Sequence, residues 1–161
     1  MKKIKWSIIL INLFLLLGYF NYSVVKKEAL LSDGKLILLK LAPIDPRSLM
    51  QGDFMRLRYD ISTNIKADSI SKRGYCVVKL DSIGIAHMVR LQKGISPKMP
   101  DEFLIEYTAG NWDINIGAES YFFEEGQSGK YEKAKYGGVK VDNKGNSLLV
   151  GLYNDQFIKI E

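Results

Sequence analysis

The stretch WSIILINLFLLLGYFNYSVV, from Trp6 to Val25, divides the chain into two parts of different character. Its twenty residues carry no charge. A helix rises about 1.5 Å per residue, so a run of this length crosses a hydrocarbon core of about 30 Å. Trp6 lies at one end and Tyr19 and Tyr22 near the other, where amphipathic rings favour the membrane interface. We therefore predict a transmembrane helix and assign residues 1–27 as an anchor in the lipid bilayer, with basic flanks.

Two other kinds of segment share this apolar character, and the surrounding residues argue against both. A cleaved signal peptide has a shorter apolar core and small residues at its cleavage site. Here the run continues into SVVKKEALL without an A-x-A pattern. A buried core helix usually carries polar positions along one face, whereas only Asn12, Asn21 and a few serines are polar in this run. An uncleaved anchor explains the segment best.

The excess of basic residues lies around that run and predicts its orientation. Five lysines and no acid fall in the first 27 residues, and they account for the whole net charge of +5. The rest of the chain is neutral, which argues against nucleic acid as a partner, because such proteins concentrate Lys and Arg on a domain face. Lys2, Lys3 and Lys5 outweigh Lys26 and Lys27, and positive charge favours the cytoplasmic side. We expect a cytoplasmic N-terminus and a periplasmic or extracellular C-terminal domain.

Residues 28–161 predict one mainly β domain with a single short helix. Gly and Pro fall at intervals typical of short strands joined by turns. The short helix is expected in GKYEKAKY, residues 129–136, which is rich in helix formers. The expected strands cover residues 35–41, 54–61, 75–80, 85–91, 103–108, 120–123, 139–142 and 146–153, with a further candidate at 156–160.

One of these strands, FMRLRYDI from Phe54 to Ile61, alternates with period two. One face carries Met55, Leu57, Tyr59 and Ile61, and the other carries Phe54, Arg56, Arg58 and Asp60. Arginine forks can bind a carboxylate or phosphate in a bidentate way that lysine cannot, so the arginines form a candidate anion-binding strip. Asp53 and Asp60 are close enough in sequence to neutralise it, and the sequence favours this second interpretation, a solvated, salt-bridged face.

The segment before that strand adds further candidates. Pro43 and Pro46 favour extended backbone, and Arg47 follows them as a third arginine. The Gly52-Asp53 pair has a structural explanation, because Gly adopts conformations closed to other residues and an Asp side chain accepts hydrogen bonds from nearby backbone N–H groups. The candidate binding residues are Arg47, Asp53, Arg56, Arg58 and Tyr59.

The same segment resembles a known family. GDFMRLRY, residues 52–59, is similar to the signature of the GDYXXLXY protein family, with Phe54 where that pattern has Tyr. DPRSLMQ (45–51) and YFFEEGQSGKYEKAKYG (121–137) also resemble conserved parts of that family. The resemblance covers nearly the whole chain and implies a small bacterial membrane-anchored protein of uncharacterised function, often found beside polytopic membrane proteins. The signature positions in place are Gly52, Asp53, Leu57 and Tyr59.

A second, local resemblance indicates an enzyme. SLMQGDF, residues 48–54, is similar to the T-L-x-x-G-D-x stretch of type I signal peptidases, which are also membrane-anchored, β-rich and extracytoplasmic. Those enzymes use a Ser/Lys dyad in which a desolvated lysine activates the serine. The nucleophile position falls at Ile44, which has no nucleophile, and the nearest candidate base is Lys93. On a shared scaffold the catalytic pair is either lost or displaced to Ser48 and Lys93.

The remaining candidates for chemistry point to structure. A single His and a single Cys do not supply the usual ligands of zinc, and we expect His87 and Cys76 to be packed among their apolar neighbours. Asp142, Asn143 and Asn146 surround a glycine, but their spacing fits a hairpin turn better than a calcium loop. We expect no metal and no cofactor.

Among five aromatic residues between positions 121 and 136, one is expected to face away from the core. Most of these rings are expected in the core, but strand alternation turns Phe122 away from Tyr121 and Phe123. An exposed Phe122 would indicate a contact surface. The group consists of Tyr121, Phe122, Phe123, Tyr131 and Tyr136.

Two functions and one structural interpretation stay open. The first is a non-enzymatic accessory or binding protein that meets a polytopic membrane partner, or a peptide-like ligand, through residues 47–59 and the loop before the short helix. The second is a membrane-bound hydrolase with a rearranged Ser48 and Lys93 site. The motif region shows no general acid–base pair, which favours the first. In the structural interpretation, Gly52 and Asp53 only set a turn.

Overall fold

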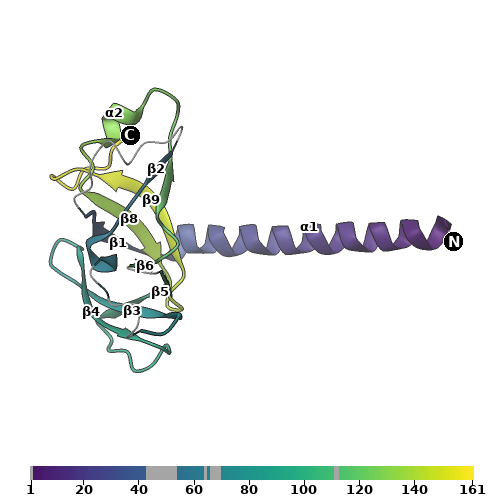
Figure 1. The fold of residues 1–161 in the computed structure, drawn as a ribbon, viewed down its shortest axis with the longest axis horizontal. Helices are drawn as coiled ribbons and strands as arrows, with labels where there is room; N and C mark the ends of the chain where they lie inside the picture. Colours follow the sequence, from purple (N-terminus) through teal and green to yellow (C-terminus); the bar gives the residue numbers. More distant parts are fainter. Residues whose placement is uncertain (1, 43–53, 64, 66–69, 111–112) are drawn as a thin grey trace.

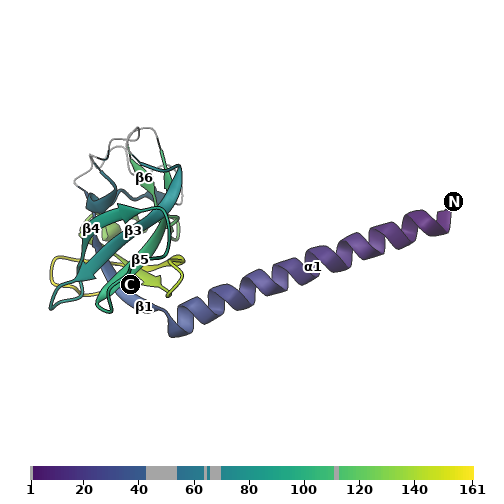
Figure 2. The same ribbon diagram turned by 90° about the horizontal axis from the view of Figure 1, so that it is seen from below.

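The computed structural model of the chain describes residues 2–42, 54–63, 65, 70–110 and 113–161. Figures 1 and 2 show one long helix, α1, which projects from a group of strands. This helix runs from Lys2 to Asp33. All the other long elements are strands. The predicted fold class is therefore confirmed: a β-rich chain preceded by a single apolar helix.

α1 is apolar around its whole circumference. Most of its large hydrophobic side chains are exposed, and none of its most apolar part is buried by the rest of the described chain. Such a helix buries its surface only in lipid or against a partner. It is long and apolar enough to cross a membrane, which fits a single-pass membrane protein. The helix also extends past the predicted apolar run, through Lys26 and Lys27 to Asp33.

The C-terminal end of α1 is attached to two strands, β8 (Tyr136–Val141) and β9 (Ser147–Tyr153). The last turn of the helix contains no basic residue. Lys140 of β8 supplies one: its Nζ donates hydrogen bonds to the carbonyl oxygens of Leu31 and Ser32. A cation is stabilising at this end of a helix dipole. Leu30 is buried at the same joint, so the anchor and the β domain are in direct contact.

The described strands form three antiparallel sheets. The first has the order β1-β8-β9, the second pairs β2 with β7, and the third has the order β4-β3-β5-β6. Two short helical segments lie between strands: η2 (Asp60–Ser62) and α2 (Ser128–Tyr131). The remaining strands are β1 (Lys35–Lys40), β2 (Phe54–Arg56), β3 (Arg73–Leu80), β4 (Ala86–Gln92), β5 (Glu102–Ala109), β6 (Ile114–Asn115) and β7 (Ser120–Phe122).

The three sheets share one hydrophobic core. β1 and β8 contribute Ile37, Leu39 and Val139, all fully buried. From the third sheet, Val78 and Ile105 pack into the same cluster. Burying a side chain of this size stabilises the fold by about 1.5–3 kcal/mol. Every sheet therefore contributes to one continuous core.

Two turns owe their shape to an Asp side chain. Asp81 Oδ1 accepts hydrogen bonds from the backbone N–H groups of Ile83 and Ile85, both at 2.9 Å. Asp142 Oδ1 does the same for Lys144 and Asn146, also at 2.9 Å. Such bonds tighten a hairpin turn. Both hairpins predicted from the sequence, around 81–84 and 142–146, are confirmed.

Three predicted elements are shorter in the structure. The strand predicted over 54–61 ends at Arg56, and the chain turns into η2, where Ser62 Oγ and N–H both bond to the Tyr59 carbonyl oxygen. In place of the helix predicted over 129–136, the structure has only the short α2, which ends at Tyr131. The candidate strand 156–160 forms a single bridge, between Tyr153 and Lys159. Local side-chain bonds and tertiary packing override residue propensity at these ends.

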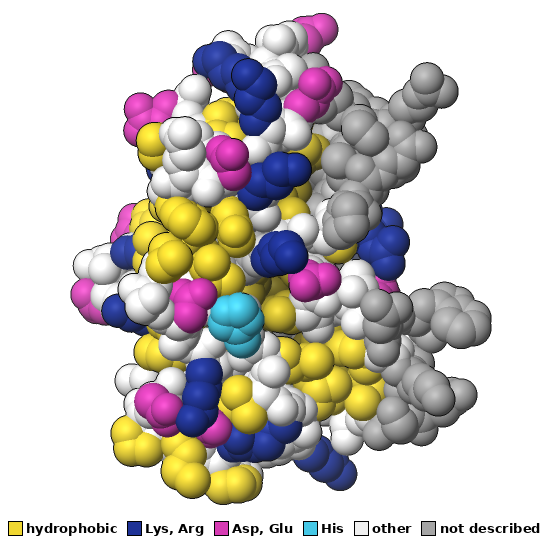
Figure 3. All heavy atoms as spheres, turned by 90° about the vertical axis from the view of Figure 1, so that its left-hand side faces the viewer, with side chains coloured by type: hydrophobic (Ala, Val, Ile, Leu, Met, Phe, Trp, Pro, Cys, Tyr) yellow, Lys and Arg dark blue, Asp and Glu magenta, His cyan; other side chains and the backbone are white. Residues whose placement is uncertain are grey.

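Cys76 is fully buried, as predicted, and burial raises the pKa of its thiol to about 12. His87 is different. The prediction that it packs among apolar neighbours is wrong, because its side chain is 67% exposed. β4 is an edge strand, so its outward residues have no further layer above them. His87 lies 3.3 Å from Asp81 Oδ2 and, in Figure 3, on the face of the domain opposite α1.

Candidate functional site

Residues 54–59, of which the first three form β2, are called the motif strand below, and their inner face belongs to the core. Met55, Leu57 and Tyr59 expose 2% or less of their surface, as the alternation predicts. The Tyr59 hydroxyl donates a hydrogen bond of 2.5 Å to the carbonyl oxygen of Ala118. Burial, and then the nearby charge of Glu119, raise the pKa of this hydroxyl. Tyr59 was a candidate binding residue; the structure corrects this, because a fully buried ring cannot touch a partner.

Tyr59 also connects residues 54–59 with the segment 121–137. A Cβ added at Gly137 would lie 2.8 Å from Cε1 of Tyr59. Only glycine leaves room for the ring at that point. Gly137 pairs with Leu39 of β1 and Leu152 of β9 in the first sheet. The motif tyrosine therefore packs against the first sheet, while its hydroxyl is bonded to the segment that leads into β7.

β2 and β7 make the second link between these parts. In the register of this pair, Phe54 lies opposite Phe122 and Arg56 lies opposite Ser120. The pairing continues beyond β2, because the N–H of Leu57 donates to the carbonyl oxygen of Glu119 at 2.7 Å. This register brings the outward residues of both strands onto one surface.

That surface carries two neighbouring phenylalanines. The rings of Phe54 and Phe122 have centroids 5.8 Å apart, a spacing typical of paired aromatic rings. Phe122 is 73% exposed, so the prediction that it turns away from its neighbours is confirmed. Tyr121 and Phe123 instead pack against Tyr131, with ring centroids 5.1 and 5.3 Å from the centroid of the Tyr131 ring. Burial and the bond to Tyr131 raise the pKa of Tyr121 to about 12.

Arg56 and Arg58 lie exposed beside the phenylalanines. The sequence favoured a salt-bridged face, but neither arginine forms an ion pair within the described part of the chain, and exposed Asp60 does not bridge to them. Beyond β7, Glu124 and Glu125 are exposed on the loop before α2. We call Phe54, Arg56, Arg58 and Phe122 the outer motif face. It has an aromatic centre and a basic end, with an acidic loop beyond it.

Several candidates from the sequence fall elsewhere. Arg47, Ser48 and Asp53 lie outside the described residues. Lys93 lies exposed in the loop between β4 and β5. A lysine that activates a nucleophile must be desolvated, so this environment does not favour Lys93 as a base.

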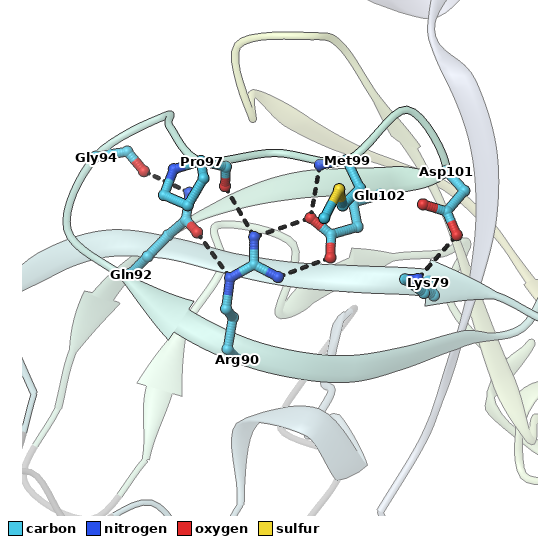
Figure 4. Close-up of polar contacts among 8 residues, drawn as sticks. All are labelled: Lys79, Arg90, Gln92, Gly94, Pro97, Met99, Asp101 and Glu102. Atoms are coloured by element: carbon cyan, nitrogen blue, oxygen red, sulfur yellow. Dashed lines mark hydrogen bonds and ion pairs between the residues drawn. The ribbon is translucent and has the colours of Figure 1, made fainter.

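The loop that carries Lys93 is held by a charged cluster that sequence reasoning missed. In Figure 4, Arg90 donates hydrogen bonds of 2.7 and 2.8 Å from Nη1 and Nη2 to the Glu102 carboxylate. Its Nη2 also donates to the Pro97 carbonyl oxygen, and its Nε donates to Gln92 Oε1. The Glu102 carboxylate also accepts from Met99 N–H at 2.9 Å. The hydrogen bonds from Arg90, and then the one from Met99 N–H, lower the pKa of Glu102 to about 2. Every charge in the cluster is paired, which is typical of a structural role.

The described residues contain no candidate metal site. Within those residues, no group of three or more His, Cys, Asp and Glu side chains is placed to hold an ion. The Asp142 carboxylate, one of the oxygens weighed for calcium, instead accepts bonds from its own turn and from Asn146 Nδ2 at 2.6 Å. Its geometry is that of the hairpin turn that the sequence favoured.

Comparison with known proteins places these contacts in a family. A family model described as GDYXXLXY protein matches residues 16–152. The chain belongs to the GDYXXLXY family. The match includes the motif strand, β7 and Gly137, so the GDYXXLXY pattern coincides with the Tyr59 packing site described above. No curated protein and no solved structure matches the chain, and the likeness to type I signal peptidases stays a prediction.

The structure shows which residues of the GDYXXLXY signature lie in the core and which lie at the surface. Its Leu57 and Tyr59 are core residues, whereas the two arginines between and before them point outward. Phe54, where the signature has Tyr, lies on the outer face with its ring against Phe122. Sequence alternation found both faces. It did not find Glu119, Ala118 or Gly137, because these contacts depend on strand register.

Proposed function

We propose that this protein is a membrane-anchored, non-enzymatic accessory subunit that binds a polytopic membrane protein through the outer motif face. One observation carries the proposal: two exposed arginines without described ion partners lie beside an exposed Phe122, whose ring pairs with the half-buried Phe54. Aromatic residues and arginine are enriched in protein interfaces. A large apolar ring held outward on a strand, beside a second ring and two arginines, supports a contact with a partner.

The chemistry of the outer motif face favours binding over catalysis. Phenylalanine has no group that exchanges a proton, and an arginine guanidinium stays protonated in proteins. Neither residue type therefore serves as a general base. Two arginine forks instead suit carboxylates on a partner, while Glu124 and Glu125 beyond the aromatic centre suit basic groups. We expect a partner segment with an apolar centre and opposite charges at its two ends.

The proposed location is the extracytoplasmic side. It is supported by the lysines before the apolar run, which outnumber those after it. A membrane-impermeant maleimide tests this in intact cells that produce the full chain with Cys76 replaced by Ala and Lys98, an exposed loop residue, replaced by Cys. Labelling of intact cells supports the location. Labelling only after cell lysis overturns it.

The binding proposal is tested by affinity purification of the full chain from native membranes in mild detergent, after in-cell crosslinking. The variants are Phe122→Ser and the double variant Arg56→Ala/Arg58→Ala, with Lys130→Ala as a matched exposed control on α2. We expect recovery of one membrane protein with wild type and control, and a loss of about fivefold or more in both face variants, as for an interface hot spot.

Two outcomes overturn the proposal. In one, no membrane protein is recovered with the wild type after crosslinking. In the other, a partner is recovered equally with wild type and both folded face variants. The purification also includes Ser48→Ala, which separates binding from hydrolysis: a binding subunit keeps its partner and its cellular function in this variant, whereas a serine hydrolase loses function.

A further inference from the structure

A second site lies where the domain meets the membrane. The apolar run of α1 ends at Val25, and the next residue, Lys26, donates a hydrogen bond of 3.2 Å from Nζ to Asn146 Oδ1. Asn146 closes the β8–β9 turn. A lysine that directly follows a membrane span lies at the level of lipid head groups. With α1 across a membrane, the β8–β9 turn would lie at the membrane surface.

A pocket opens beside this turn. Its volume is about 340 Å³, and its lining is mostly polar. It lies between the start of β3, the end of β5, β6 and the β8–β9 turn, so strands from two sheets build it. Glu106 N–H donates to the carbonyl oxygen of Gly145 at 2.8 Å, which holds the turn against β5. The polar residues that line it are Arg73, Glu106, Thr108, Asn115, Asn146 and Ser147.

The pocket offers one cation and one anion on the same face of a sheet. Arg73 lies directly opposite Thr108, and Glu106 is two residues from Thr108 along β5, so the two charged side chains are diagonal neighbours. Both are exposed, and within the described chain they form no ion pair with each other or with another residue. A ligand that carries both charges can fit between them.

We infer that this pocket binds the head group of a phosphoethanolamine lipid from the adjacent leaflet. The Arg73 guanidinium takes the phosphate through its planar fork. The primary ammonium of the lipid donates hydrogen bonds to the Glu106 carboxylate, with Thr108 and Asn115 as further polar neighbours. A phosphocholine head group has no N–H to donate, and a phosphoglycerol head group has no cation for Glu106. The site is built from other strands than the outer motif face and stands independently of the proposed partner.

The test uses the full chain in a bilayer with equal parts of phosphatidylethanolamine, phosphatidylglycerol and phosphatidylcholine. The protein is extracted in mild detergent, and its retained lipids are counted by native mass spectrometry. We expect wild type to retain phosphatidylethanolamine at least about fivefold over the other two lipids. Arg73→Gln should lose retention, and Glu106→Gln should lose the preference over phosphatidylcholine. Lys130→Gln and Glu132→Gln, exposed elsewhere on the domain, should behave like wild type.

Folding of each variant is checked by its circular dichroism spectrum and melting temperature. Arg73→Lys keeps the positive charge and should restore part of the retention that Arg73→Gln loses. Equal retention of the three lipids by wild type overturns the inference, as does a preference for phosphatidylglycerol. A preference for phosphatidylethanolamine that survives in both Arg73→Gln and Glu106→Gln also overturns it, because the lipid is then held at another place.

Discussion

The two faces of the motif strand differ in burial, since one packs in the core and the other lies at the surface. On the inner face, Leu57 and Tyr59 are buried, and the tyrosine hydroxyl is hydrogen bonded. On the outer face, one residue away, Arg56 and Arg58 are exposed, and Phe54 touches an exposed Phe122. The comparison shows that alternate residues of one short signature have different environments. Alternate residues build the fold, and those between them are free to meet a partner.

The largest effect is expected from removing the inner ring. Tyr59→Ala should lower the free energy of unfolding by about 3–5 kcal/mol, because it leaves a cavity in the shared core and an unpaired carbonyl oxygen at Ala118. Urea unfolding of the full chain in detergent, followed by circular dichroism, measures this loss. Arg58→Ala, on the other face, should stay within about 0.5 kcal/mol of wild type. Equal losses in the two variants would remove the distinction between the faces.

A smaller loss of stability is expected when a methyl group is added next to the Tyr59 ring than when the ring is removed. Gly137→Ala should cost about 1–3 kcal/mol, because the new methyl group would lie 2.8 Å from the Tyr59 ring. Gly129→Ala is the matched control, since nothing lies within 4 Å of a Cβ added there. The same unfolding measurement applies. A Gly137→Ala variant as stable as Gly129→Ala would show that the Tyr59 ring does not pack against the first sheet at Gly137.

A pH-dependent effect is expected beside the inner face, at Glu119. Burial raises the pKa of this carboxyl, although it accepts a hydrogen bond of 2.5 Å from Ile116 N–H. The charged form is therefore disfavoured in the folded state, and its cost is present above the raised pKa and absent below the ordinary value of about 4.3. Glu119→Gln should raise the melting temperature slightly at pH 7, and the gain should disappear as the pH falls below about 4.

The melting temperatures of wild type and Glu119→Gln are compared across this pH range. Glu125→Gln, on the exposed loop before α2, is the control and should show no such pH-dependent gain. A Glu119→Gln variant that melts below wild type at pH 7 would contradict the expectation, since the carboxylate would then be stabilising in its charged form.

The smallest effect on stability is expected on the outer face. Phe122→Ser should change the free energy of unfolding by no more than about 0.5 kcal/mol, because the ring is mostly exposed. The neighbouring Tyr121→Ser should cost distinctly more, since Tyr121 packs against the core. These adjacent residues separate the two faces within β7. A large loss in Phe122→Ser would mean that the aromatic pair serves the fold.

Much of the fold was predictable from local patterns. An uncharged run of twenty residues identified the helix, and alternation identified which side of the motif strand is buried. The Asp side chains at 81 and 142 marked two hairpin turns correctly. The errors lie where the environment of a residue depends on its neighbours in space. His87 sits on an edge strand, and Tyr59, a candidate binding residue, is fully buried.

The sequence by itself determined that the protein has an apolar helix, a neutral β-rich domain and a motif strand with two unlike faces, because charge and periodicity are properties of consecutive residues. Only the tertiary structure decided that Phe54 meets Phe122, that Gly137 makes room for Tyr59, and that Arg73 and Glu106 share a pocket beside Lys26. Each of these depends on the register between strands far apart in the chain. That register is set by the packing of the whole core, which no local pattern records.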